Sequence, residues 1–99
     1  MKILVTGTAG FIGSFVAKKL AQRGDIVFGI DSINDYYDVS LKYSRLSDSG
    51  FDRADVDSGK VVKSSLYPDY RFCKISLEDQ LSIKSLFEQE KFDMVCHLA

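Results

Sequence analysis

The stretch Val5-Thr-Gly-Thr-Ala-Gly-Phe-Ile-Gly13 decides the fold, because it places glycines at positions 7, 10 and 13 between two segments of different periodicity. The preceding run, Lys2–Thr6, is short, aliphatic and β-branched, as is typical of a strand covered on both faces. In the following segment, residues 11–23, apolar residues recur at a helical spacing. The sequence therefore predicts a strand, a tight glycine turn and a helix.

The predicted helix carries Ile12, Val16 and Leu20 at four-residue spacing, and we expect this stripe to pack on a sheet. Gly24 follows as a C-terminal stop. A second apolar run, Ile26–Ile30, ends at Asp31 and completes a strand–helix–strand unit, which requires parallel strands and a right-handed crossover.

Further elements repeat this alternation along the chain. Residues 36–46 are weakly helical, 70–75 and 92–98 read as strands, and a helix follows Ser76, which we expect to cap it. The polar stretch 47–69 reads as a loop with a short strand near Val61-Val62. The order βα-βα-βα-β predicts an α/β, Rossmann-type, doubly wound parallel sheet with strand order 3-2-1-4 and helices on both faces.

Each glycine of the turn has a predicted role in binding a dinucleotide. Gly7 allows a backbone conformation that disfavours a Cβ, Gly10 lets a pyrophosphate approach the main chain, and Gly13 lets the helix press on the strand. The backbone N–H groups of Phe11 and Ile12 then face the phosphates at the positive end of the helix. The alternative is a tight turn without a ligand.

Asp31 is the predicted selector of the cofactor, since an ionised carboxylate at the end of the second strand accepts hydrogen bonds from ribose hydroxyls. A 2′-phosphate about 4 Å away would cost on the order of 4 kcal/mol at an effective dielectric near 20. No Arg or Lys lies between Gly7 and Gly13 or just after Asp31 to offset this cost. The sequence therefore predicts NAD rather than NADP.

Composition excludes several classes of function. Thirteen basic and fourteen acidic residues give a net charge of −1, which argues against a nucleic-acid partner. The apolar runs are too short for a membrane span or a secretory signal, so we expect a cytoplasmic protein. Cys73 and Cys96 are expected to be buried free thiols, and His97 has no partner at metal-ligand spacing.

The glycine spacing, Asp31 and the closing His97-Leu98-Ala99 resemble the extended short-chain dehydrogenase/reductase superfamily. The run Gly29-Ile-Asp-Ser-Ile-Asn-Asp-Tyr-Tyr-Asp-Val39 is most similar to nucleotide-sugar epimerases, above all the UDP-glucuronate 4-epimerase group. The resemblance implies a tightly held NAD that oxidises a sugar hydroxyl at carbon 4 and returns the hydride to the other face.

The resemblance also implies roles for further residues. It places Ser32 and Asn34 beside the adenosine, Ser76 and Leu77 against the adenine, and Leu98 and Ala99 near the middle of the cofactor. Two positions depart from the family pattern: Ser76 replaces the usual aspartate, and Ser32 replaces a frequent asparagine.

No catalytic residue is predicted in this chain. The family's Tyr-x-x-x-Lys lies beyond position 99, and the one match here, Tyr70 with Lys74, falls in a predicted strand, where four residues span about 13 Å. The pair Tyr36-Tyr37 has two interpretations, contact with substrate or packing of the loop.

Three functions remain open. Residues 1–99 read as the N-terminal NAD-binding part of an epimerase, apparently truncated, with the substrate domain and catalytic half absent and the chain alone inactive. The alternatives are a nucleotide-binding module without chemistry, or part of a related dehydratase or decarboxylase. In each case the fourth strand would be an exposed edge, so we expect the chain to self-associate.

Overall fold

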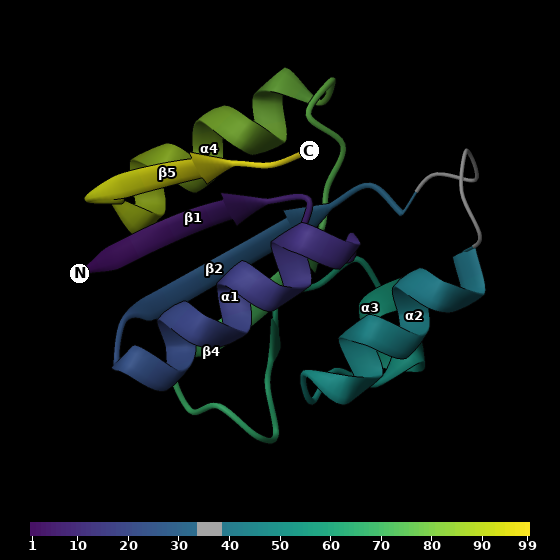
Figure 1. The fold of residues 1–99 in the computed structure, drawn as a ribbon. Coiled ribbons are helices and arrows are strands. Elements are labelled where there is room, and N and C mark those ends of the chain that lie inside the picture. The colour runs from purple at the N-terminus through teal and green to yellow at the C-terminus, as the bar shows by residue number, and fades with distance from the viewer. Residues whose placement is uncertain (34–38) are drawn as a thin grey trace.

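The described residues, 1–33 and 39–99 of the computed structural model, build a five-stranded sheet in the order β3-β4-β2-β1-β5 (Figure 1). The strands are β1 (Lys2–Thr6), β2 (Ile26–Asp31), β3 (Val62–Lys63), β4 (Tyr70–Lys74) and β5 (Met94–His97). All pairings are parallel except that of β3 with β4. The predicted order 3-2-1-4 is confirmed, with β3 as an antiparallel addition at one edge.

Parallel register brings the carboxyl ends of the strands to one edge of the sheet. Thr6 of β1 pairs with Ile30 on one side and with His97 on the other, and Asp31 pairs with Lys74 of β4. Residues that lie far apart in the sequence, namely the glycine turn, the end of β2 and the end of β5, therefore meet at this edge.

Helices cover both faces of the sheet, as expected (Figure 1). On one face, α1 (Phe11–Arg23), α2 (Val39–Asp48) and α3 (Arg53–Asp57) pack over a core cluster that includes Val5, Val27 and Phe72. On the other face, α4 (Gln80–Glu90) packs over a smaller cluster that includes Phe28.

The predicted buried stripe of α1 is wrong at Ile12, while Leu20 is partly buried and packs against the core. The buried residues of α1 are Gly13, Ser14 and Ala17, whereas Ile12 is 63% exposed. Small side chains let the helix backbone approach the strands closely, and this turns the larger residues of the first turn away from the sheet. The four-residue periodicity identified the helix but not the face that packs.

The segment 47–69 is more ordered than predicted. Beyond the expected strand, it holds the last residues of α2 and all of α3, and it buries Phe51 and Val56 completely. Phe51 packs edge-on against Tyr70 at 4.9 Å between ring centroids. The short helix has too few residues for a visible periodicity, so tertiary packing decides its structure.

Two smaller predictions also need correction. Asp79, not Ser76, caps α4, because its carboxylate accepts a hydrogen bond from the Ser82 N–H at 3.2 Å. Both cysteines are free thiols, but Cys73 is buried and Cys96 is only half-buried. Tyr36, Tyr37 and the start of the predicted helix there lie outside the described residues.

Candidate functional site

Two adjoining cavities of about 300 and 410 Å³ lie at the carboxyl ends of the parallel strands. Together we call them the crevice. Both cavities are lined by the same four residues: Gly7, Asp31, Lys42 and Ala99. The first cavity adds three predicted site residues, Ser32, Ser76 and Leu77, and the second adds Gly10, Phe11 and Leu98. Most residues predicted from the sequence are therefore gathered around one space.

Among the described residues, two predicted site residues do not line the crevice. Gly13 lies behind it, where the helix meets the glycine turn. Ile12 is exposed on the first turn of α1, so only its backbone N–H remains a candidate contact. Asn34 lies outside the described residues.

The glycine turn is shaped by backbone contacts that side chains would block. Gly7 has a left-handed φ of 79°, and its N–H donates to the Ile30 carbonyl at 2.8 Å. A Cβ at Gly13 would lie 2.0 Å from the Gly7 carbonyl oxygen, so glycine is required there for the helix to pack. A Cβ at Gly10 would have the Gly7 carbonyl oxygen, at 3.2 Å, as its close neighbour among the described atoms and would otherwise enter open space.

The start of α1 is suited to an anion. Gly10 is its N-cap, no side chain caps it, and its first turn contains no acidic residue. The positive end of the helix dipole and the first backbone N–H groups therefore lie beside the crevice without a carboxylate from the helix's own first turn.

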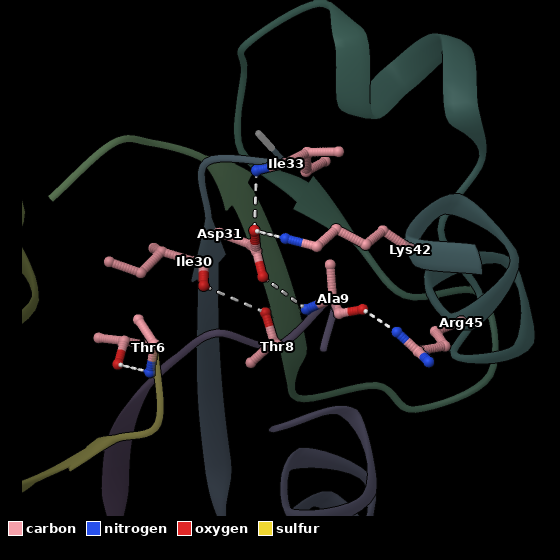
Figure 2. A network of polar contacts seen from close by, with 9 residues as sticks. Thr6, Thr8, Ala9, Ile30, Asp31, Ile33, Lys42 and Arg45 are labelled. Carbon is pink, nitrogen blue, oxygen red and sulfur yellow. Dashed lines mark hydrogen bonds and ion pairs between the residues drawn. The ribbon is translucent and has the colours of Figure 1, made fainter. Parts of the chain in front are cut away.

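Asp31 is the charged centre of the crevice (Figure 2). Its Oδ2 accepts a hydrogen bond from the Ala9 N–H at 3.1 Å, and its Oδ1 accepts one from the Ile33 N–H at 2.7 Å. Its Oδ1 also lies 3.4 Å from the Lys42 ammonium. These contacts fix the orientation of the carboxylate at the end of β2.

Lys42 and Arg45 are site residues that the sequence reasoning missed. Both come from α2: Lys42 reaches Asp31, and the Arg45 guanidinium donates to the Ala9 carbonyl at 3.3 Å (Figure 2). The prediction that no basic residue offsets Asp31 holds only for its sequence neighbours and is wrong in three dimensions. The available signal was their i, i+3 spacing within a predicted helix.

Thr6 fixes the end of β5 against the glycine turn. Its hydroxyl oxygen accepts hydrogen bonds from the N–H groups of Leu98 and Ala99, at 2.9 and 3.2 Å, and lies 2.8 Å from His97 Nδ1. A Cβ at Gly7 would come within 2.9 Å of the Ala99 nitrogen. Leu98 and Ala99 therefore form a wall of the crevice.

Tyr70 and Lys74 do not form a reactive pair. Tyr70 is completely buried in the core, and this burial raises the pKa of its hydroxyl. Lys74, at the other end of β4, is exposed, and its ammonium lies 3.9 Å from Asp57. Within the described residues, no group of three or more His, Cys, Asp or Glu side chains could hold a metal ion.

An open parallel sheet with a glycine turn, a helix N-terminus and a strand-end aspartate around a crevice at a crossover point defines a Rossmann-type dinucleotide-binding protein. Comparison with known families agrees and is more specific. Residues 3–99 match the model of the NAD dependent epimerase/dehydratase family, and the chain belongs to this family.

Individual relatives point in the same direction. The chain is 43% identical over 99 residues to Protein CapI of Staphylococcus aureus, covering 100% of this chain and 25% of the relative. It is 38% identical over 96 residues to a UDP-glucuronate 4-epimerase of Thermodesulfobacterium geofontis, covering 97% of this chain and 25% of the relative. The chain thus spans about a quarter of the length of these relatives.

A solved structure shares the fold. A UDP-glucuronic acid 4-epimerase variant from Bacillus cereus, in complex with UDP-4-deoxy-4-fluoro-glucuronic acid and NAD, superposes with a TM-score of 0.71 at 29% identity. The match covers 100% of this chain and 26% of that chain.

Proposed function

We propose that this chain is the NAD-binding portion of a nucleotide-sugar 4-epimerase. The observation that carries the proposal is the crevice, in which the buried Asp31 carboxylate and the glycine turn face the same space. The family to which the chain belongs supports the cofactor, and relatives named UDP-glucuronate 4-epimerase support the reaction.

The residues fit NAD. Asp31 offers acceptor oxygens for ribose hydroxyls, Gly10 leaves open space for a phosphate, and the uncapped start of α1 offers N–H donors from Phe11 and Ile12. Ser32, Ser76 and Leu77 line the first cavity, to which we assign the adenosine. When bound, NAD supplies a hydride acceptor at its nicotinamide ring.

For the parent protein, we propose a UDP-sugar as substrate, with UDP-glucuronate favoured by the names of the relatives. Tyr70–Lys74 is the single Tyr-x-x-x-Lys in this sequence, and its geometry is unsuitable, so we expect the chain alone to be inactive. A dehydratase is the second candidate, because the family to which the chain belongs is described as NAD dependent epimerase/dehydratase. A related decarboxylase is a further alternative from the resemblance. Cytoplasmic localisation remains a proposal from the sequence; no helix in the described residues is long and apolar enough to cross a membrane.

Calorimetric titration with NAD tests the site directly. We expect the wild-type chain to bind NAD and Asp31→Ala to weaken binding by about a hundredfold, because each hydrogen bond to a charged acceptor contributes roughly 1.5–3 kcal/mol. Asp48→Ala is the control, since Asp48 is exposed at the end of α2. A folded chain, verified by circular dichroism, that binds no NAD would contradict the proposal.

We also propose that the chain self-associates through β5. In the described residues β5 pairs only with β1, and its Met94 and Val95 are 50% and 45% exposed. An open apolar strand edge pairs readily with another copy. Light scattering at tens of micromolar should detect dimers or larger species that Val95→Lys reduces and Leu66→Lys, at an exposed site elsewhere, does not. A monodisperse wild-type monomer would refute this proposal.

A further inference from the structure

We propose that Lys42 is a specificity-determining residue that sets how strongly the site discriminates against a 2′-phosphate. In this proposal the Lys42 ammonium, at the adenosine end of the crevice, attracts a 2′-phosphate, and the negative charge of Asp31 opposes this attraction. The inference rests on the proposed dinucleotide function and concerns the choice between NAD and NADP.

The geometry places the two charges in competition for the same region. Lys42 Nζ lies 3.4 Å from Asp31 Oδ1, and the side chains of Lys42 and Asp31 are only 10% and 6% exposed. Both residues line both cavities of the crevice. Any group that Asp31 binds through a hydroxyl is therefore also within the field of the ammonium.

The existing hydrogen bonds of Asp31 limit how many further donors its carboxylate can accept. Among the residues that the structure describes, three donors contact its two oxygens: the N–H groups of Ala9 and Ile33 and the Lys42 ammonium. A carboxylate has about four acceptor positions, so a ribose diol needs at least one position now used by a donor. The Lys42 contact is the longest of the three, and the long side chain can turn its ammonium towards an incoming oxygen.

Charge decides the direction of the effect. A 2′-phosphate is repelled by Asp31 and attracted by Lys42, whereas the 2′-hydroxyl of NAD donates a hydrogen bond to Asp31 and, carrying no net charge, interacts only weakly with the Lys42 charge. Screening is weak for a nearly buried pair, so each charge acts at close to full strength. Removing Lys42 should therefore raise the preference for NAD, and neutralising Asp31 should lower it.

Arg45 provides a matched comparison on the same helix. Its guanidinium donates to the Ala9 carbonyl and lies 5.9 Å from the Phe11 ring centroid, on the glycine-turn side of the crevice. Arg45 lines only the second cavity, without Ser32, Ser76 or Leu77. Loss of this charge should affect both cofactors by the same factor, because they share the pyrophosphate.

The experiment measures dissociation constants for NAD and NADP by calorimetry in wild type, Lys42→Gln, Asp31→Asn and the double variant, with Arg45→Gln as control. We expect Lys42→Gln to increase the ratio of the NADP constant to the NAD constant by about tenfold, and Asp31→Asn to decrease it by at least as much. In the Asp31→Asn background, Lys42→Gln should again weaken NADP selectively. Lys42→Arg, which keeps the charge, should retain the wild-type ratio to within a few-fold.

The outcomes separate this inference from the proposed function. If NAD binds but Lys42→Gln leaves the ratio unchanged in both backgrounds, the role of Lys42 is wrong and the dinucleotide site stands. If Arg45→Gln changes the ratio as much as Lys42→Gln, the effect is general electrostatics and the assignment to Lys42 is wrong. If neither cofactor binds the folded wild-type chain, the proposed function itself fails. The double variant removes both buried charges together, so it keeps the test informative even if a single variant is unstable.

Discussion

Charged residues are arranged differently at the two ends of the parallel strands. At the amino ends of the strands, charges are paired with one another: Glu90 of α4 contacts both Lys2 and Arg71, and Asp25 pairs with Arg23. At the carboxyl ends, Asp31 and Lys42 also pair, but both residues line the two cavities of the crevice.

The difference between the two ends distinguishes polar contacts that stabilise the fold from those that are placed to bind a ligand. Charges at the amino end connect β1, β4 and α4. At the carboxyl end, the crevice is lined in part by Gly7 and Gly10, where larger side chains would occupy its space. Variants at the two ends should therefore separate stability from cofactor binding.

The largest expected effect is that of Gly13→Ala. The new Cβ would lie 2.0 Å from the Gly7 carbonyl oxygen and 2.6 Å from the Gly7 carbonyl carbon, both backbone atoms that cannot move without shifting the turn. We expect a loss of about 3 kcal/mol or more in the free energy of unfolding, in the range of severe overpacking. Urea denaturation followed by circular dichroism measures it.

Gly10→Ala is the matched control for this prediction. Its Cβ meets one carbonyl oxygen, at 3.2 Å, and otherwise enters the crevice, so the fold should lose only about 1 kcal/mol or less while affinity for NAD falls. Equal losses of stability in Gly10→Ala and Gly13→Ala would remove the distinction between a packing glycine and a phosphate-facing glycine.

A smaller effect, with a defined pH dependence, is expected at the amino end. Arg71, with help from Lys2, holds the pKa of Glu90 below its ordinary value of 4.5. A carboxylate with a depressed pKa in the folded state contributes stability that is present above its unfolded pKa and lost as the pH falls through its folded pKa. Glu90→Gln should therefore cost about 1 kcal/mol at pH 7 and progressively less below about pH 4.5.

The measurement is urea unfolding of wild type and Glu90→Gln between pH 7 and pH 3. Glu88→Gln is the control, because Glu88 is exposed on the same helix. A destabilisation by Glu90→Gln that is constant across this range would mean that packing, not charge, explains the contribution of Glu90.

The smallest expected effect has the opposite sign. Tyr70 begins β4, and its buried hydroxyl makes no hydrogen bond of ordinary geometry among the described residues, with the Thr8 side chain as its polar neighbour. Tyr70→Phe removes that unsatisfied group while keeping the ring contact with Phe51, so stability should be unchanged or rise by up to about 1 kcal/mol. Thermal unfolding checks this, with Tyr43→Phe, which loses a hydrogen bond to Asp57, expected to be destabilised. A clear loss of stability in Tyr70→Phe would show that its hydroxyl is satisfied in solution.

Local pattern was sufficient for most of the elements, though not for α3, and for most of the residues that line the crevice. Apolar runs located β1, β2, β4 and β5, and the glycine spacing beside a helix located the turn, because strand and helix periodicities are properties of neighbouring residues. Asp31 could be placed for the same reason: the end of a parallel strand is also an edge of the sheet.

The tertiary structure decided what depends on residues distant in sequence. It selected Gly13 and Ala17 rather than Ile12 as the packed face of α1, and it buried Phe51 within a segment that reads as a loop. Above all, it brought Lys42 to Asp31. Helix packing and the meeting of charges are set by how elements dock, and the periodicity of a single element carries no information about its partner's surface.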